Sequence, residues 1–288
     1  MSSFNTVQID GEVLDPATAA IPVSDLGFVR GVGVFEVIRA FSGVNFRIAE
    51  HLERLARSAA MFGLELPADD VLAAWCNTAA EGQDESVIRI MVTAGDDLFE
   101  GTPRVVVTSE DPTPQPAEMT LCPLPAPWHS DGADWELLRG KTLSYGNNYG
   151  AIRQAKLNGF DNALLIGRSG RILEGPTFSV GWVVEEEDRI IYETPAMNVG
   201  ILDSITRQLA FDAADDAGLV FREVEVGLER LADALEFFVV STLRDAISVT
   251  AVGDRIFLNG HHTTTLRRAM QDRTSRELAA HESIASIV

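Results

Sequence analysis

The chain has 288 residues, of which 46% are hydrophobic and 23% charged, a composition typical of a folded protein with a sizeable core. Its 23 basic and 43 acidic residues give a net charge of −20, which disfavours binding to a nucleic-acid backbone. No apolar run approaches the ~18 residues of a membrane span, the first residues show no signal-peptide pattern, and there are only two cysteines. We therefore expect a cytoplasmic protein without a disulfide framework that binds neither nucleic acid nor membrane.

The first 120 residues alternate strand-like and helix-like patterns. Asp10 and Gly11 lie between two short apolar runs and predict a β-hairpin over residues 4–14. Apolar residues at spacings of three and four predict a helix after position 47, and Pro67 precedes a second one. The remaining expected elements are, in order, strands over 34–41 and 44–47, helices over 48–62 and 68–81, and strands over 87–93 and 104–108.

A proline-rich stretch separates this part from the rest. Six prolines fall between positions 112 and 127, which is typical of an exposed connection. Beyond it we expect helices near 148–158, 204–217, 228–234 and 264–282, and strands near 163–167, 171–173, 178–184, 189–193 and 235–240. The pattern predicts an α+β protein with a small α/β domain over 1–120, an interdomain connection over 121–133 and a larger domain over 134–288.

Lysine is rare in this chain: Lys141 and Lys156 stand against 21 arginines. As a surface charge the two residue types are equivalent, but only lysine readily loses its proton and attacks a carbonyl group. The neighbours of Lys141 are small or polar, as at a strand end that opens into a cavity, although an ordinary surface lysine fits them too. Lys156 is expected at the C-terminus of a helix, where a cation meets the helix dipole.

Three later segments have residues suited to binding a charged ligand. Glu174 precedes a strongly apolar strand and, if buried, needs a partner. Ser204 is a residue type that caps helices, and the free amides of the helix after it form a potential anion site. The Ser241-Thr242 step follows an apolar strand and offers hydroxyl groups to a phosphate. Each feature also occurs as plain structure, namely an exposed strand-edge glutamate, a capped helix and a polar turn.

In this order the segments resemble the fold-type IV pyridoxal-phosphate enzymes. That group comprises D-amino-acid and branched-chain aminotransferases, aminodeoxychorismate lyase and (R)-amine transaminases. The segment Gly31–Glu36 resembles the family's G-D-G-V-F-E, and His51–Leu55 resembles its H-x-x-R-L helix. The resemblance spans about residues 25–250. It implies a two-domain fold of the D-amino-acid aminotransferase type, pyridoxal 5'-phosphate bound by the larger domain, no metal, and a homodimer with a shared active site.

The resemblance also assigns roles to single residues. Lys141 would form the Schiff base with the cofactor and then carry the proton, and Glu174 would pair with the pyridine nitrogen. Tyr145 would hydrogen-bond the phenolic oxygen of the cofactor, or else pack in the core. The expected phosphate ligands are Arg54, the amides of Ile205 and Thr206, and the hydroxyl of Thr242.

Departures from the family's motifs bear on the substrate. Val32 replaces the family's Asp, residues 176–179 read P-T-F-S instead of the usual S-x-S-N, and no histidine completes an Arg-x-His carboxylate trap after Arg89. Arg30 and Arg89 are the expected replacements, as the two α-carboxylate ligands found in less typical D-amino-acid transaminases. For Arg89, a structural ion pair is the alternative.

The sequence therefore predicts a pyridoxal-phosphate transaminase that moves an amino group between a D-amino acid and a 2-oxo acid by way of pyridoxamine phosphate. D-alanine or D-glutamate would be the donor and 2-oxoglutarate the acceptor. The alternatives within the same fold are a branched-chain L-amino-acid aminotransferase, aminodeoxychorismate lyase and an (R)-amine transaminase. A non-catalytic protein that kept the fold is an alternative of a different class.

Overall fold

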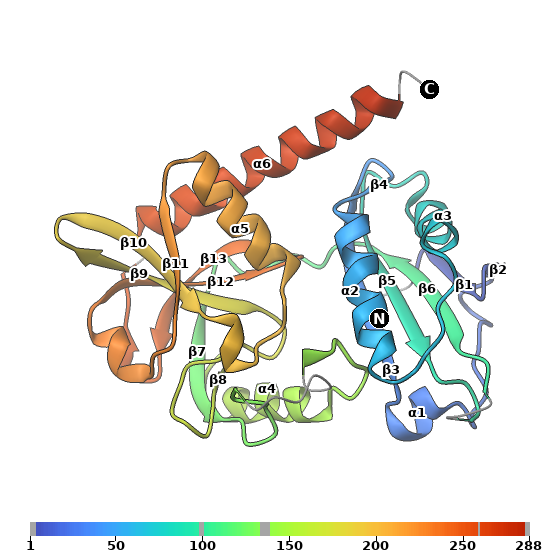
Figure 1. Ribbon diagram of the computed structural model, residues 1–288, viewed down its shortest axis with the longest axis horizontal. Helices are drawn as coiled ribbons and strands as arrows, with labels where there is room; N and C mark the ends of the chain where they lie inside the picture. Colours follow the sequence, from blue (N-terminus) through green and yellow to red (C-terminus); the bar gives the residue numbers. More distant parts are fainter. Residues whose placement is uncertain (1–3, 98–100, 133–138, 259, 286–288) are drawn as a thin grey trace. The chain divides into compact units, whose positions relative to one another are not determined.

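The computed structural model describes residues 4–97, 101–132, 139–258 and 260–285, which form two compact units (Figure 1). Unit 1 comprises Met1–Pro114 and Gly140–Tyr145, and unit 2 comprises Gln115–Arg139 and Gly146–Val288. Each unit has its own sheet and helices, so the predicted α+β class is confirmed. Within the described residues, no helix is both long enough and apolar enough to span a membrane.

Unit 1 is built on a six-stranded antiparallel sheet in the order β2-β1-β6-β5-β3-β4. Its strands are β1 (Thr6–Ile9), β2 (Glu12–Leu14), β3 (Gly33–Phe41), β4 (Val44–Asn45), β5 (Glu85–Thr93) and β6 (Arg104–Glu110). Its helices are α1 (Leu26–Arg30), α2 (Ile48–Ala60) and α3 (Asp69–Ala80). The predicted hairpin and the predicted helices over 48–62 and 68–81 are confirmed, whereas the short helix α1 was not expected.

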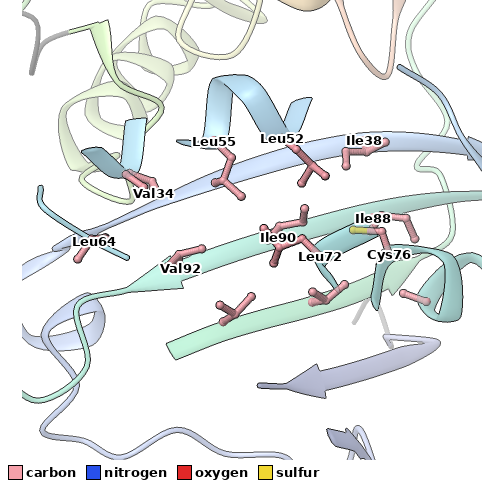
Figure 2. Close-up of a cluster of buried hydrophobic side chains, with 14 of the residues drawn as sticks. Val34, Ile38, Leu52, Leu55, Leu64, Leu72, Cys76, Ile88, Ile90 and Val92 are labelled. Atoms are coloured by element: carbon pink, nitrogen blue, oxygen red, sulfur yellow. The ribbon is translucent and has the colours of Figure 1, made fainter. Parts of the chain in front are cut away.

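The core of unit 1 lies between one face of this sheet and helices α2 and α3 (Figure 2). Side chains alternate along β5, so that Ile88, Ile90 and Val92 are buried in this core. Leu52 and Leu55 of α2 pack on them from the helix side. The alternation places the side chain of Arg89 on the opposite face of the sheet.

Unit 2 contains a mixed sheet in the order β11-β10-β9-β12-β13-β7-β8, with β14 paired to β13. Its strands are β7 (Glu118–Pro125), β8 (Asn162–Ile166), β9 (Ser179–Glu186), β10 (Arg189–Pro195), β11 (Val220–Val224), β12 (Ala234–Ser241), β13 (Asp245–Val252) and β14 (Arg255–Ile256). Its α-helices are α4 (Gly146–Leu157), α5 (Ile205–Asp216) and α6 (His261–Ala285), and its 3-10 turns are η2 (Met197–Val199) and η3 (Leu228–Ala232). Helix α5 packs against α6, which also contacts β13 (Figure 1).

The division of the chain lies elsewhere than predicted. Residues 121–133 were expected to connect two domains, but β7 begins at Glu118 and lies between β13 and β8 in the sheet. Pro123 and Pro125 fall in the part of β7 that pairs with β8 beyond the last β13 pair at Leu121. Proline lacks the N–H that a central strand donates, and it is tolerated here because one side of β7 is no longer paired.

Smaller differences between the predicted and the observed elements also depend on which distant segments pair with each other. Of residues 171–173, Arg171 and Ile172 form isolated bridges instead of a strand, and the helix expected over 228–234 is the 3-10 turn η3. Strands β11, β13 and β14 were not expected, because their short or mixed patterns become strands only when neighbouring strands pair with them.

Candidate functional site

Lys141 lies in the segment of six residues that returns to unit 1. The backbone of this segment is hydrogen-bonded to the start of β3. Phe35 N donates to Lys141 O at 2.9 Å, and Leu143 N donates to Gly33 O at 2.9 Å. The amide of Lys141 donates to the hydroxyl of Ser58 on α2 at 3.1 Å. A Cβ atom at position 33 would lie 2.4 Å from the carbonyl oxygen of Val92, so the close approach of these strands requires glycine there.

Phe35 brings together two of the predicted site residues. The Lys141 Nζ lies 4.4 Å from the centre of the Phe35 ring, and the ring of Tyr145 packs edge-on against it with centroids 5.2 Å apart. The other lysine, Lys156, is exposed in the last turn of α4, which is the helix-end position predicted for it. The two lysines therefore occupy different environments: Lys141 is half-buried over an aromatic ring, and Lys156 is on a helix surface.

Arg54 is buried in unit 1 and forms an ion pair with Glu36 through two hydrogen bonds. Nε and Nη2 of Arg54 donate to Oε1 and Oε2 of Glu36, each at 2.7 Å. The Nδ1 of His51 lies 2.7 Å from Oε2 of the same carboxylate. One turn of α2 thus supplies both partners of a glutamate that has no solvent exposure.

The electrostatics of this cluster favour a charged carboxylate and a neutral imidazole. Burial by itself would raise the pKa of Glu36, but the charge of Arg54 and hydrogen bonds from Arg54 and His51 lower it to about 2. Burial lowers the pKa of His51 from 6.5, and the charges of Arg54 and Lys141 act in the same direction against the opposing effect of Glu36. His51 therefore donates Nδ1–H to the carboxylate as a neutral ring.

Glu36 had no predicted role, although the two segments that resemble family motifs contain all three residues of this cluster. The segment Gly31–Glu36 ends at Glu36, and His51–Leu55 contains His51 and Arg54. The available signal was its position in β3, where Val34, Glu36 and Ile38 share one face and the other two are fully buried. A glutamate at a core position requires a cationic partner. The sequence could have shown that Glu36 needs a partner, but not that the partner is Arg54.

The two predicted carboxylate ligands differ in their contacts. Arg30 lies in the last turn of α1, is exposed, and forms no ion pair or hydrogen bond with the described residues through its side chain. Arg89 donates through Nε and Nη2 to Oε1 of Glu110 at 2.9 and 2.5 Å. This is the structural ion pair that was the alternative for Arg89, and it leaves Nη1 without a partner among the described residues.

Glu174 lies in unit 2 with its side chain only 16% exposed. The amide of Leu202 is 3.3 Å from both carboxylate oxygens, and Nε2 of His129 is 3.3 Å from Oε1. All three contacts are longer than the ~2.8 Å of a strong charge-assisted hydrogen bond. The carboxylate is therefore oriented by the protein while it keeps the capacity to accept a shorter bond from another donor.

His129 was not predicted as a site residue. Its Nε2 faces Glu174, and its Nδ1 is buried and finds no hydrogen-bond partner in the described part of the chain. A contact across 45 positions leaves no pattern in the sequence. The structure identifies His129 as the side chain that touches Glu174.

The start of α5 and the β12–β13 turn are in contact. Ser204 caps α5, its hydroxyl accepting from the amide of Arg207 at 3.2 Å. The Thr206 hydroxyl in the first turn of the helix lies 3.4 Å from the Thr242 hydroxyl. No described residue accepts a hydrogen bond from the amides of residues 205 and 206, as is usual at a helix N-terminus. Hydroxyls and free amides at the positive end of a helix dipole are suited to binding an anion, and this cluster is the candidate anion site.

A single short loop links this anion site to Glu174. Leu202 donates its amide to the Glu174 carboxylate, and Ser204, two residues later, caps α5. Before them Gly200 has a φ of +87°, and its carbonyl accepts from the Ser130 hydroxyl at 3.0 Å. The loop therefore holds a carboxylate at one end and an anion site at the other, within one unit.

One group of residues in unit 2 has the composition of a metal site. Glu236, His261 and His262 bring their ligand atoms within 4.8 Å of one another. The Glu236 carboxylate, however, accepts from the Thr263 amide and hydroxyl, both at 2.8 Å, and from the His262 amide at 3.1 Å. It therefore caps the positive end of α6, a place unfavourable to a cation, and the expectation of no metal stays a prediction.

Sequence comparison places the chain among aminotransferase-like proteins. The family described as Amino-transferase class IV matches residues 33–252. A Methanocaldococcus jannaschii protein, provisionally named a branched-chain-amino-acid aminotransferase, is 27% identical over 92% of this chain and 95% of its own length. A D-alanine aminotransferase of Bacillus licheniformis is 27% identical over 95% and 98%. The bifunctional aminodeoxychorismate lyase / D-amino acid transaminase of Mycobacterium tuberculosis is 27% identical over 86% and 91%.

Solved structures agree with the sequence comparison. The pyridoxal-phosphate-bound form of a hypothetical aminotransferase from Mycobacterium tuberculosis has a TM-score of 0.85 at 24% identity, covering 94% of this chain and 99% of that one. A fold IV transaminase from Curtobacterium pusillum has a TM-score of 0.83 at 27% identity, covering 92% and 98%. The predicted fold type is confirmed.

Proposed function

Because the chain belongs to the class IV aminotransferases, we propose that it moves an amino group between a D-amino acid and a 2-oxo acid. Pyridoxal 5'-phosphate is the cofactor of this family. The observation that carries the proposal is the Glu174 carboxylate, held by three contacts of 3.3 Å at the start of the loop that leads to the anion site. A partly buried carboxylate held so loosely is suited to the protonated nitrogen of a pyridine ring.

The donor groups of the chain fit this cofactor. Lys141 offers an amine that is half-buried over Phe35. Glu174 offers a carboxylate with unused acceptor capacity for the ring nitrogen. The phosphate would be bound by the Thr206 and Thr242 hydroxyls together with the free amides at the start of α5.

The bound cofactor supplies an aldehyde that condenses with amines and a ring that accepts electrons from the substrate. Lys141 Nζ would take the proton from the substrate Cα atom and pass it to the bound cofactor, and in the second half of the reaction it would move a proton in the reverse direction. Glu174 would keep the proton on the ring nitrogen, because its negative charge stabilises the pyridinium form. Tyr145, packed edge-on against the same Phe35 ring as Lys141, would hydrogen-bond the phenolic oxygen.

Arg54 would add a guanidinium to the phosphate site. Its Nε and Nη2 edge is bound to Glu36, which fixes the plane of the guanidinium group. In this reading Glu36 is a positioning residue: it orients Arg54 and does not touch the cofactor itself.

The choice of a D-amino acid is supported by the similarity to the Bacillus licheniformis D-alanine aminotransferase and by the two arginines proposed for the α-carboxylate. Arg30 has no competing partner among the described residues. Arg89 would keep Glu110 on one edge and offer Nη1 to the substrate. A branched-chain L-amino acid is the second candidate, because the Methanocaldococcus jannaschii relative is equally identical. Aminodeoxychorismate lyase activity is the third, since one relative combines it with transamination.

The active form would be a homodimer with a shared active site, as the family resemblance implies. Light scattering and activity measured across a dilution series test this, and a fully active monomer would contradict it.

A panel of half-reactions tests the proposed activity directly. Purified protein loaded with cofactor is mixed with one D- or L-amino acid at a time. Stopped-flow measurements then follow the loss of the visible (yellow) absorbance of the enzyme-bound cofactor. D-alanine and D-glutamate should convert the cofactor to its amino form, whereas branched-chain L-amino acids should react slowly. The reverse preference would favour the second candidate, and pyruvate formed from aminodeoxychorismate would favour the third.

A further inference from the structure

Arg244 is a half-buried arginine of unit 2 for which the described residues provide no carboxylate. It ends the tight turn between β12 and β13, closed by a hydrogen bond from the Arg244 amide to the Ser241 carbonyl at 2.9 Å. Its Nη1 donates to the Ser241 hydroxyl at 3.2 Å, while its Nε is buried and has no acceptor. The turn therefore holds a guanidinium whose Nε side is unsatisfied.

Other arginines of the same unit donate Nε to an acceptor, and Arg267 does so to the Ala246 carbonyl without a carboxylate partner among the described residues. Arg207, Arg222 and Arg230 each donate to at least one glutamate. In unit 1, Arg54 and Arg89 use the Nε and Nη2 edge to bind a carboxylate. A shielded charge without a counter-charge is unfavourable unless a ligand supplies one. Burial lowers the pKa of Arg244, which is consistent with a cation that lacks an anionic partner.

Arg244 is linked to both parts of the proposed cofactor site in unit 2, namely the Glu174 segment and the start of α5. Its central carbon lies 5.6 Å from the centre of the Phe178 ring. Phe178 closes the turn that follows Glu174, because its carbonyl accepts from the Gly175 amide at 2.9 Å. Two residues before Arg244, Thr242 contacts Thr206 at the anion site.

Thr242 and Arg244, two polar residues of this turn, have different partners. The Thr242 hydroxyl contacts the first turn of α5, where the cofactor phosphate is proposed to bind. The Arg244 guanidinium instead lies against Phe178. Phe178 belongs to the turn that follows Glu174, the residue proposed to pair with the ring nitrogen of the cofactor. A cation in this place, separate from the hydroxyls that would bind the phosphate, is suited to a second anionic group.

We propose that Arg244 binds a carboxylate of the amino-acid and 2-oxo-acid substrates, through its Nε edge. This rests on the proposed function, which requires substrates with a carboxylate. The group bound is either the α-carboxylate shared by all such substrates or the side-chain carboxylate of a dicarboxylic one. A planar guanidinium binds either group by two parallel hydrogen bonds.

The test compares Arg244→Gln with wild type in the cofactor-loaded enzyme, using non-reacting probes so that no turnover is needed. Calorimetry measures the affinity for propionate, a monocarboxylate, and for glutarate, a dicarboxylate. The variant should bind the relevant probe roughly ten- to a hundredfold more weakly, because charge-assisted hydrogen bonds are lost. Weaker binding of both probes identifies the α-carboxylate, and weaker binding of glutarate alone identifies the side-chain carboxylate. Affinity for the cofactor, measured by fluorescence, should change less than about twofold.

Arg255 provides a matched control, since its guanidinium also lies 5.6 Å from a phenylalanine ring, that of Phe257, and donates to backbone carbonyls. Arg255→Gln should leave both probe affinities unchanged. If Arg244→Gln does not fold, Arg244→Lys keeps the charge but loses the planar fork, and it should still bind the probes severalfold more weakly.

Unchanged affinity for both probes in the Arg244 variants would overturn the proposal. So would a loss of cofactor affinity as large as the loss of probe affinity, since that outcome would assign Arg244 to the phosphate. Half-reactions with D-glutamate and (R)-1-phenylethylamine give a further check, because the first has both an α-carboxylate and a side-chain carboxylate and the second has neither, and equal losses for both would also overturn it. Failure of the wild-type enzyme to react with any amino acid would reject the proposed function instead, while the probe affinities would still report on Arg244.

Discussion

Glu36 and Arg54 form a buried ion pair in unit 1 with two hydrogen bonds of 2.7 Å, although they are 18 positions apart on β3 and α2. His51 contacts the same carboxylate at 2.7 Å. This geometry fixes the plane of the Arg54 guanidinium. It also means that removing one partner leaves the other as an unpaired buried charge.

Replacing Glu36 by Gln should therefore destabilise the protein by about 3 kcal/mol, because the buried Arg54 charge loses its counter-charge. It should also weaken cofactor binding, since Arg54 is no longer held in one orientation. Urea unfolding and a cofactor titration measure the two effects. Glu53→Gln is the matched control: its exposed pair with Arg57 on the same helix should contribute no more than about 0.5 kcal/mol. Equal effects of the two substitutions would contradict the structural role of the buried pair.

The pH dependence of stability should report on the same cluster. The pKa of Glu36 is about 2 in the folded protein against an ordinary 4.5, so its contribution is complete above about pH 4.5 and is lost as the pH falls toward 2. The pKa of His51 is lowered from 6.5, so stability should also decline as the pH falls below 6.5, where the unfolded chain takes up a proton first. Urea midpoints between pH 8 and 2 measure both declines. In Glu36→Gln the lower decline should become smaller but remain in part, because the pKa of Glu193 is also lowered from 4.5 in the folded protein, and a profile of unchanged shape would refute the assignment.

The two lysines make a direct test of the covalent attachment site. Lys141→Ala should abolish transamination, whereas Lys156→Ala, on the exposed end of α4, should retain it. Borohydride reduction followed by peptide mapping locates the lysine that carries the cofactor. Label on Lys156 would reject the proposed role of Lys141.

Glu174→Gln should bind the cofactor but slow the half-reaction by on the order of 10²–10³, because a neutral amide does not hold a proton on the ring nitrogen. Stopped-flow absorbance with D-alanine measures the rate, and cofactor titration confirms loading. Glu225→Gln, in a solvent-exposed pair with Arg171, serves as the control and should react at the wild-type rate. A wild-type rate in Glu174→Gln would remove this residue from the mechanism.

Arg30→Ala and Arg89→Ala should each lower half-reaction efficiency with amino acids roughly ten- to a hundredfold, with a much smaller loss for a primary amine that has no carboxylate. For Arg89 the decisive comparison is Glu110→Gln, which breaks the ion pair but keeps the guanidinium. If Arg89 binds substrate, only Arg89→Ala should impair amino acids selectively. If both variants lower the melting temperature alike and neither discriminates between the two kinds of substrate, Arg89 is a structural residue.

Much of the local structure was determined by the sequence itself. The hairpin over 4–14, the strand over 34–41 and the helix over 48–62 follow from turn residues and from periods of two and of about 3.6. The family, and the segments from which the site residues were proposed, could also be recognised in the chain. These features depend on neighbours a few positions apart, which is why periodicity and short motifs predict them.

Tertiary structure decided the rest, because it depends on pairing and desolvation between distant segments. The proline-containing β7 is a strand because β13 and β8 pair with it, and residues 140–145 belong to unit 1 because they bond to the start of β3. The partner of Glu36 and the contact between His129 and Glu174 likewise join residues 15 to 45 positions apart. That the described residues offer no carboxylate to the Arg244 guanidinium is visible only in the fold, since whether a charge has a counter-charge depends on which distant side chains surround it.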